Sequence, residues 1–373
     1  MVLSNIRIKE LEANSIELTA QYVFDLLSEG RRERRTYHLA PTLGEVEHAF
    51  PDSRSILNSR NKYDKSHLSF IPPLGKDQIG IASLDLRIGR LIAESDTIIQ
   101  GVTKKDMLKM KHWILEENQP FTFNYDPEGG KVYYVSSFEC IFPSTDLELH
   151  VDSKSTTGRL GTMTHGAGID QERELITIIQ PFSFPIKITI GKTRLYQMAI
   201  RFKNTPYMTN EEILKSDEIK VLKTKSIKNS LNSRGLLLRF NPSFAYKAKK
   251  CDIPIDMDNP NNNQWENYFE IVEGNSQLRL DKKTLYLLGS LEELCLGGVS
   301  GFLSREEEVM TGTGAWGHFA GIIQPYFVGG ITLEYFSYNN RILKKGDSAG
   351  VIRFDQLVGE IKDPEKYKGS YHK

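Results

Sequence analysis

Short runs of β-branched and aromatic residues recur along most of the chain, and polar residues separate them. Pro, Gly and Asn interrupt these runs at short intervals, which favours a sandwich or barrel over a sheet with alternating helices. The pattern therefore predicts a mainly β protein. The predicted strands are Lys131–Ser136, Leu147–Val151, Ile176–Gln180, Ile186–Ile190, Leu195–Phe202, Gly235–Phe240, Thr284–Leu288, Ile331–Phe336 and Ala349–Phe354.

Apolar residues at helical spacing are concentrated in two segments, residues 16–29 and 104–117. The first stops at Gly30, a residue that readily caps a helix in left-handed backbone. The second carries Met107, Met110 and Trp113 at the same kind of spacing. A polar, Arg-rich stretch at about residues 31–66 lacks any such pattern, and we interpret it as an insertion.

Two strand pairs suggest a duplicated β module. Residues 176–202 contain two predicted strands around Ile190-Gly191-Lys192, and residues 331–354 contain two around Lys345-Gly346-Asp347. Each pair follows a bend that contains Pro or Gly and ends in an aliphatic and aromatic strand, which indicates an internal repeat.

The chain has 373 residues, more than one domain usually holds, so two domains are expected. A stretch rich in Lys, Ser and Asn separates the two repeats and is typical of a solvated linker. We predict a first module at residues 1–211, which includes the insertion, a linker at 212–232 and a second module at 233–373.

Charge and cysteine content narrow the class of protein. Lys plus Arg and Asp plus Glu both total 48, whereas nucleic-acid and membrane-surface proteins normally carry a basic excess. Cys140, Cys251 and Cys295 are widely spaced without a CxxC motif, which favours a reducing compartment. With no signal-peptide pattern and no long apolar run, we expect a soluble, cytoplasmic protein that binds neither nucleic acid nor membrane.

Two common chemistries are excluded by spacing. A Walker phosphate loop would need glycine five residues before Gly191-Lys192-Thr193, where the chain has Ile186. No histidine stands in an HxE pattern and no Pro-Cys-x-x-Cys exists, which argues against a zinc deaminase. We therefore predict no protein-bound metal site.

Two segments carry candidate chemistry. Lys154–Gly161 combines three hydroxyl residues with one arginine, and Glu334 places a carboxylate inside the strand run Gly329–Phe336. The first segment could form an ordinary turn with a solvated guanidinium. Alternation puts Glu334 on the face of Thr332 and Phe336, so it points either to solvent or into a pocket.

Taken together, these segments resemble the dCTP deaminase branch of the dUTPase superfamily. Lys154–Gly161 is similar to the family's K/R-S-S-x-x-R-L-G loop, and Gly329–Glu334 to its G-x-I-x-L-E strand. Several ordered matches are more specific than any one of them. The matched segments are Met1–Ser4, Ile79–Gly89, Lys154–Gly161, Gly329–Glu334, Gly346–Phe354 and Lys366–Ser370.

The resemblance implies two dUTPase-like distorted jelly-roll β-barrel modules in tandem, with a few short helices. The hydroxyl and arginine residues lie in the first module and Glu334 in the second, as in a fused form of the family. Ile178 stands where the first module would hold the glutamate, and Ser304–Glu308 replaces the hydroxyl loop of the second. One composite site per chain, formed between modules, is the expectation.

The function implied is metal-independent hydrolytic deamination of dCTP to dUTP and ammonia. By this resemblance Glu334 is the general base, Ser155 holds the water or the base edge, and Arg159 orients the carboxylate. Mg²⁺ would enter with the triphosphate, and the partners would be nucleotides and further copies of the chain in a trimer-based homo-oligomer. The residues expected to bind substrate are Lys154, Thr156, Gln324, Lys366 and Tyr367.

Some positions depart from the family pattern. Many relatives carry Arg-Ile-Asp-Pro-Gly before the glutamate strand, whereas this chain has Ile322-Ile323-Gln324-Pro325-Tyr326. A bifunctional deaminase and dUTP pyrophosphatase, and a catalytically inactive nucleotide sensor, therefore remain alternatives. A purely structural β-sandwich would explain none of the matched segments.

Overall fold

The computed structural model describes residues 2–3 and 68–358, apart from 73, 75, 81, 127, 129, 144–146, 171–172, 223–226, 305–314 and 318–319. The predicted helix at 16–29, the insertion at 31–66 and the tail residues Lys366 and Tyr367 lie outside the described residues. So does most of the segment Ser304–Glu308.

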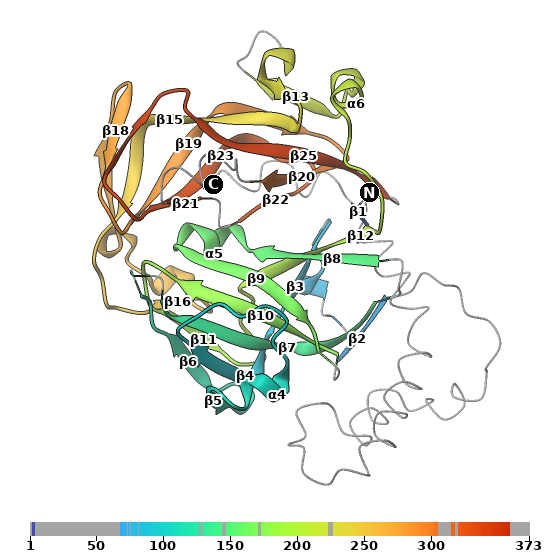
Figure 1. Cartoon of the computed structure of the whole chain (residues 1–373), viewed down its shortest axis with the longest axis vertical. Coiled ribbons are helices and arrows are strands. Elements are labelled where there is room, and N and C mark those ends of the chain that lie inside the picture. The colour runs from blue at the N-terminus through green and yellow to red at the C-terminus, as the bar shows by residue number, and fades with distance from the viewer. Residues whose placement is uncertain are drawn as a thin grey trace, which may run out of the picture.

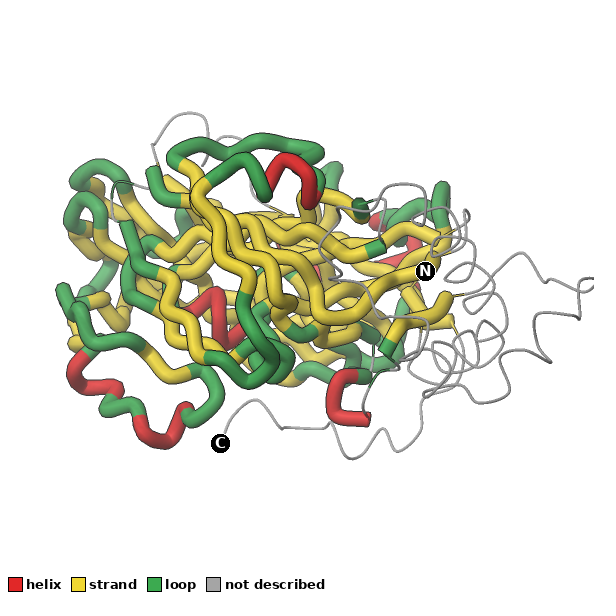
Figure 2. Tube along the Cα trace, turned by 90° about the horizontal axis from the view of Figure 1, so that it is seen from below, coloured by secondary structure: helices red, strands yellow, loops and turns green. Residues whose placement is uncertain are grey.

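Strands dominate the described chain (Figure 2), and they form two halves that pack against each other (Figure 1). The helices among the described residues are short: α4 (Lys104–Met107), α5 (Ser155–Arg159), α6 (Asn210–Lys215) and four 3₁₀ turns. Strands of the first half are β2 (Leu68–Ile71), β3 (Leu84–Leu86), β4 (Ile88–Ser95), β5 (Lys111–Ile114), β6 (Pro120–Phe123), β7 (Val132–Pro143), β8 (Leu147–Ser153), β9 (Thr162–Ile169), β10 (Glu174–Pro181), β11 (Ile186–Thr189) and β12 (Tyr196–Phe202). Strands of the second half are β13 (Ile219–Leu222), β14 (Leu231–Asn232), β15 (Gly235–Ala248), β17 (Phe269–Glu273), β18 (Gln277–Leu280), β19 (Thr284–Leu296), β20 (Val299–Ser304), β21 (Ala315–Gly317), β22 (Ile322–Ile323), β23 (Val328–Ser337), β24 (Arg341–Lys344) and β25 (Ser348–Val358).

All nine predicted strands are present, several of them longer than predicted. Each half encloses its own apolar core, because alternate residues of its strands turn inward. Tyr133 and Ile179 belong to the first core, and Leu238, Leu333 and Tyr335 to the second. The alternation of the sequence therefore places one set of side chains of each half in an apolar core.

The two halves repeat one hydrogen-bonded unit. Arg87 donates from Nε to Glu139 Oε1 at 2.6 Å and from its backbone N–H to Oε2 at 3.0 Å. Arg239 makes the same two bonds to Glu292, at 2.7 and 2.8 Å. Both glutamates are buried, so each depends on its arginine for compensation of the charge.

The glycine turns repeat as well. Gly191 and Gly346 have φ values of +73° and +90°, where a side chain would strain the backbone. The N–H of Gly191 donates to the carbonyl of Ile88, and that of Gly346 to the carbonyl of Phe240, at 2.9 and 3.0 Å. These are the two turns that the sequence pattern marked as the centres of a duplicated module.

The predicted helix at residues 104–117 is wrong beyond its first turn. Thr103 and Asp106 form a capping box that starts α4, which ends at Met107. β5 follows and pairs antiparallel with β4, so that Leu91 faces Ile114. This segment forms a strand and not a helix because Trp113 packs edge-on against Phe121, with ring centroids 5.1 Å apart, and because β4 offers an edge for ladder hydrogen bonds.

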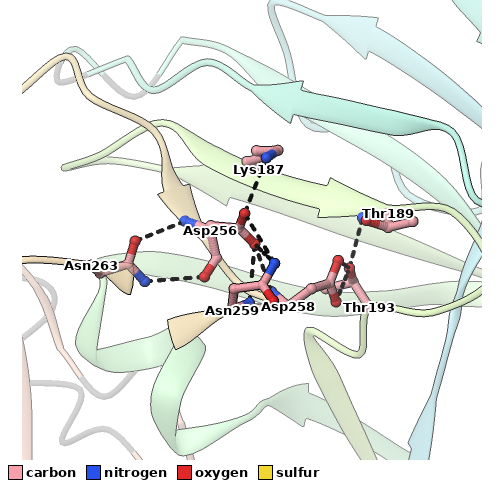
Figure 3. A network of polar contacts seen from close by, with 7 residues as sticks. All are labelled: Lys187, Thr189, Thr193, Asp256, Asp258, Asn259 and Asn263. Atoms are coloured by element: carbon pink, nitrogen blue, oxygen red, sulfur yellow. Dashed lines mark hydrogen bonds and ion pairs between the residues drawn. The ribbon is translucent and has the colours of Figure 1, made fainter. Parts of the chain in front are cut away.

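A segment of the second half adds a strand to the first half. β16 (Ile255–Asp256) pairs in parallel with β11, placing Ile255 opposite Ile186. Side chains hold the crossing segment in place (Figure 3): Lys187 pairs with Asp256 at 3.0 Å, and Thr193 donates to Asp258 at 2.8 Å. The two halves are therefore interlocked.

The N-terminal strand β1 (Val2–Leu3) also joins the halves, pairing with β12 of the first and β25 of the second. The predicted linker at residues 212–232 includes the end of α6 and all of β13, which pairs with β19. Within the described part of the chain, no helix has both the length and the apolar character needed to cross a membrane.

Candidate functional site

The hydroxyl-rich segment forms one short helix, not an open turn. α5 follows Lys154 and gives way to left-handed backbone at Gly161, whose φ is +67°. Glycine adopts this conformation without steric cost, and a Cβ there would lie only 2.4 Å from Ser183 Oγ. Ser155 and Arg159 are four residues apart, so the helical turn places them on one side of α5.

Glu334 belongs to a strand that is buried on both faces. On one face of β23, Leu333 and Tyr335 enter the core of the second half. On the other face Phe336 joins the core of the first half, with its ring centroid 5.0 Å from that of Phe182. Since side chains two residues apart share a face, Glu334 points with Phe336 toward the first half.

A cavity of about 160 Å³ lies where α5 meets β23, and Ser155, Arg159 and Glu334 all line it. In Figure 1, α5 sits at the boundary between the two halves. The structure thus brings together the three residues predicted to be catalytic, two from the first half and one from the second. The other lining residues are Gln197, Ala320, Ile322, Ile323, Gln324, Phe327, Gly330, Ile331 and Thr332.

The carboxyl group of Glu334 is poorly solvated. The residue is 2% exposed, and its Oε2 has no hydrogen-bond partner among the described residues. Burial raises the pKa of Glu334 to about 8; its own backbone N–H and the charge of Arg159 lower it, and the charge of Asp152 raises it further. A carboxyl group with a pKa near neutrality is suited to exchange protons with a reactant.

The predicted substrate-binding residues that the structure describes do not all line the same cavity. Gln324 lines the cavity with the catalytic residues. Lys154 forms an ion pair with Asp85 of β3 at 2.5 Å. Thr156 and Arg159 line a separate groove of about 490 Å³, together with aromatic residues of the second half such as Trp265. Arg159 therefore stands between the cavity and this groove.

Two polar residues at the site had not been singled out from the sequence. Asp152, on β8, accepts the backbone N–H of Gly321 at 2.9 Å and so ties the first half to the segment before β22. Gln197, on β12, lines the cavity. Each is a single polar residue next to an apolar residue of its strand, so no local motif identifies it. The pairing of β8 with β12 brings the two residues together.

The equivalent position in the first half is packed inside an apolar cluster. Leu175 and Ile331 occupy matching places, because each donates its N–H to a buried serine, Ser137 or Ser290, at 2.9 Å. Three residues further on lie Ile178 and Glu334. Ile178 is buried in a separate apolar cluster that includes Met107 of α4. In the first half, α4 therefore covers this face of the sheet, whereas the matching face of the second half packs against the first half.

Within the described ranges, no group of three or more His, Cys, Asp or Glu side chains is arranged to hold a metal ion. The three cysteines are free thiols.

No family model and no curated protein sequence matches the chain. Its fold, however, resembles a solved deaminase. The chain is similar to 2'-deoxycytidine 5'-triphosphate deaminase from Agrobacterium tumefaciens, with a TM-score of 0.67 and 21% sequence identity. The likeness covers 79% of this chain and 94% of that chain. Since neither half holds 79% of the residues, strands of both halves take part.

This likeness establishes the fold. The prediction of a mainly β chain with two dUTPase-like modules and few short helices is confirmed.

Proposed function

We propose that the chain deaminates a cytosine deoxynucleotide, with dCTP as substrate and dUTP and ammonia as products. The observation that carries the proposal is the cavity between the halves, which Glu334 lines together with Ser155 and Arg159. A buried carboxyl group with an unpartnered oxygen is unusual, and one whose pKa lies near 8 can take up and release protons at physiological pH. The fold of the Agrobacterium tumefaciens deaminase supports this choice of reaction.

The reaction can be written with Glu334 as the sole proton carrier. The ionised carboxylate takes one proton from water while the hydroxide adds to C4 of cytosine, and that proton passes to N3. The tetrahedral carbon then holds a hydroxyl and an amino group. Glu334 moves the hydroxyl proton to the amine, the C–N bond breaks, and ammonia leaves a carbonyl at C4. Positioned acid–base catalysis of this kind contributes roughly 10²–10⁴-fold.

The other two residues act on geometry and charge. The Ser155 hydroxyl can hold the attacking water or the base edge, because a hydroxyl both donates and accepts. The positive charge of Arg159 favours the ionised form of Glu334, which is the form that the first step needs. Ile322, Ile331 and Phe327 form an apolar part of the cavity wall, and exclusion of water beside it strengthens each of these interactions.

We propose that Mg²⁺ reaches the protein on the phosphate oxygens of the nucleotide, as this ion commonly does. Lys366 and Tyr367, beyond the described residues, are proposed to contact the triphosphate. Assembly into a trimer-based homo-oligomer and a cytoplasmic location also stay predictions.

Incubation of the full chain with dCTP and Mg²⁺ tests the proposal. We expect ammonia and dUTP in equal amounts, measured by an ammonia-coupled assay and by chromatography of the nucleotides. Glu273→Gln, which alters an exposed glutamate of β17, is a matched control and should leave the rate unchanged.

Other products would select among the alternatives. dCTP binding by calorimetry without any product would instead support a nucleotide sensor. Release of dUMP and pyrophosphate would show that the protein also hydrolyses dUTP.

A further inference from the structure

One wall of the cavity is a chain of hydrogen bonds that starts at a backbone carbonyl. Gln197 donates from Nε2 to the carbonyl oxygen of Ser153 at 3.2 Å. A carbonyl oxygen can only accept, so the amide nitrogen of Gln197 must face Ser153. The amide oxygen of Gln197 must then point the other way, as an acceptor.

Gln324 completes the chain. Its Nε2 donates to Gln197 Oε1 at 3.2 Å and to the hydroxyl of Ser83 at 2.7 Å. The Ser83 hydroxyl lies 3.5 Å from Gln197 Oε1 and donates to it, which leaves its lone pairs for Gln324. Both hydrogens of the Gln324 amide are therefore engaged, and reversing this amide would place oxygen against oxygen.

The consequence is an acceptor of fixed orientation on a residue that lines the cavity. Gln324 Oε1 is buried and has no hydrogen-bond partner in the described part of the chain, and Gln324 lines the same cavity as Glu334. A buried acceptor without a partner is costly unless a ligand supplies a donor. Because the Gln324 amide is neutral, it also adds no second negative charge beside the carboxyl group of Glu334.

We propose that Gln197 and Ser83 are positioning residues, which lock Gln324 so that its carbonyl oxygen accepts a hydrogen bond from a neutral donor of the bound nucleotide. The inference rests on the proposed function and names how the same site recognises its substrate. Uncharged donors on dCTP are limited to the 4-amino group and the 3'-hydroxyl. Glu334 works at the 4-amino group, which leaves the 3'-hydroxyl for Gln324.

The test is a double-variant cycle measured with dCTP. Gln197→Leu removes the lock while keeping a similar volume, and it should raise KM roughly 2- to 13-fold, the range for one neutral hydrogen bond, with kcat within about twofold. In a Gln324→Leu background the same change should have no further effect on KM. A purely structural role of Gln197 would instead give independent, multiplying effects, and that result would overturn the inference.

A second variant and a second ligand test the same inference. Ser83→Ala should raise KM in the same direction, and it serves if Gln197→Leu does not fold. 2',3'-Dideoxycytidine triphosphate should bind the wild-type protein more weakly than dCTP but bind Gln324→Leu as well as dCTP does. Equal loss of affinity in both proteins would contradict the pairing of Gln324 with the hydroxyl.

Failure of the proposed function would look different. In that case the wild-type protein would not convert dCTP, whether or not it binds the nucleotide. If the wild-type protein is active and Gln197→Leu has the same KM, only the positioning role is wrong. Gln277→Leu, on β18 and exposed, is the control for loss of a glutamine amide remote from the cavity.

Discussion

Ile178 and Glu334 occupy equivalent positions in the two halves of the chain. Each lies three residues after a backbone N–H that donates to a buried serine hydroxyl. Their cross-strand partners, Tyr134 and Leu287, also match, both being three residues before that serine. One position faces α4 and the other faces a cavity, so the same place in the fold serves packing in one half and chemistry in the other.

Replacing Glu334 with Gln should remove activity without removing the fold. The amide keeps the size of the side chain but cannot accept a proton from water, so we expect kcat to fall at least 10²-fold. Affinity for dCTP, measured by calorimetry, should change by less than about tenfold. Turnover of the variant at the wild-type rate would show that Glu334 is not the base.

Replacing Ile178 with Val should lower stability and leave activity unchanged. Removal of one methylene from a packed core costs about 0.5–1.5 kcal/mol, and Ile178 is fully buried beside Leu91 and Tyr134. We therefore expect a lower free energy of unfolding in urea and an unchanged kcat. A loss of activity in the folded variant would mean that the first half carries a site of its own.

The strands could be predicted from the sequence because their alternation is local. Runs such as Tyr196–Phe202 carry enough β-branched and aromatic residues to form strands in any β fold. The repeat was visible for the same reason, since Gly191 and Gly346 interrupt similar runs. β5 was misread as helix because Met107, Met110 and Trp113 fit helical spacing, whereas its pairing with β4 is decided by tertiary contacts.

The pairing of Ser155 and Arg159 with Glu334 could be predicted only from the family resemblance. No local pattern links residues so far apart. The hydrogen bonds of Gln324 to Gln197 and of Gly321 to Asp152 span 127 and 169 positions. Such contacts depend on how the two halves pack, and an isolated Gln on a strand carries no sign of its partner.

The raised pKa of Glu334 predicts how activity changes with pH. Because the base must be ionised, kcat/KM should rise with pH up to about 8 and level off above it. The charge of Asp152 raises this pKa, so Asp152→Asn, which keeps an oxygen acceptor for Gly321, should move the midpoint to lower pH. A profile that is flat between pH 6 and 9 would contradict Glu334 as the base.

The same group predicts a pH dependence of stability that needs no activity assay. The pKa of Glu334 is about 8 in the folded protein against a usual value of 4.5, so the folded state binds the proton more tightly. This stabilisation is complete below about pH 4.5 and is lost as pH rises toward 8, at about 1.4 kcal/mol per pH unit.

Glu334→Gln mimics the protonated form and should be free of this loss. The difference in unfolding free energy between wild type and variant, measured in urea at several pH values, should therefore shift in favour of the variant from pH 5 to 8. A constant difference would show that the carboxyl group of Glu334 titrates normally.

A buried ion pair joins β12 of the first half to β25 of the second. Arg201 of β12 donates from Nε to Asp355 of β25 at 2.5 Å, and both side chains are at most 7% exposed. The guanidinium also lies 4.1 Å from the ring centre of Tyr207. Removal of one partner from such a pair leaves an uncompensated buried charge and costs about 3–5 kcal/mol.

Asp355→Ala leaves Arg201 with the exposed Glu148 at 3.8 Å, so the unfolding free energy in urea should fall by up to about that amount. Arg201→Met combined with Asp355→Ala should recover part of the loss, because the double variant leaves no buried charge unpaired. Lys111→Ala is the control: its pair with Glu94 has the lysine 66% exposed, and an exposed pair contributes at most about 1 kcal/mol. If Asp355→Ala costs no more than Lys111→Ala, the Arg201–Asp355 pair does not hold the halves together.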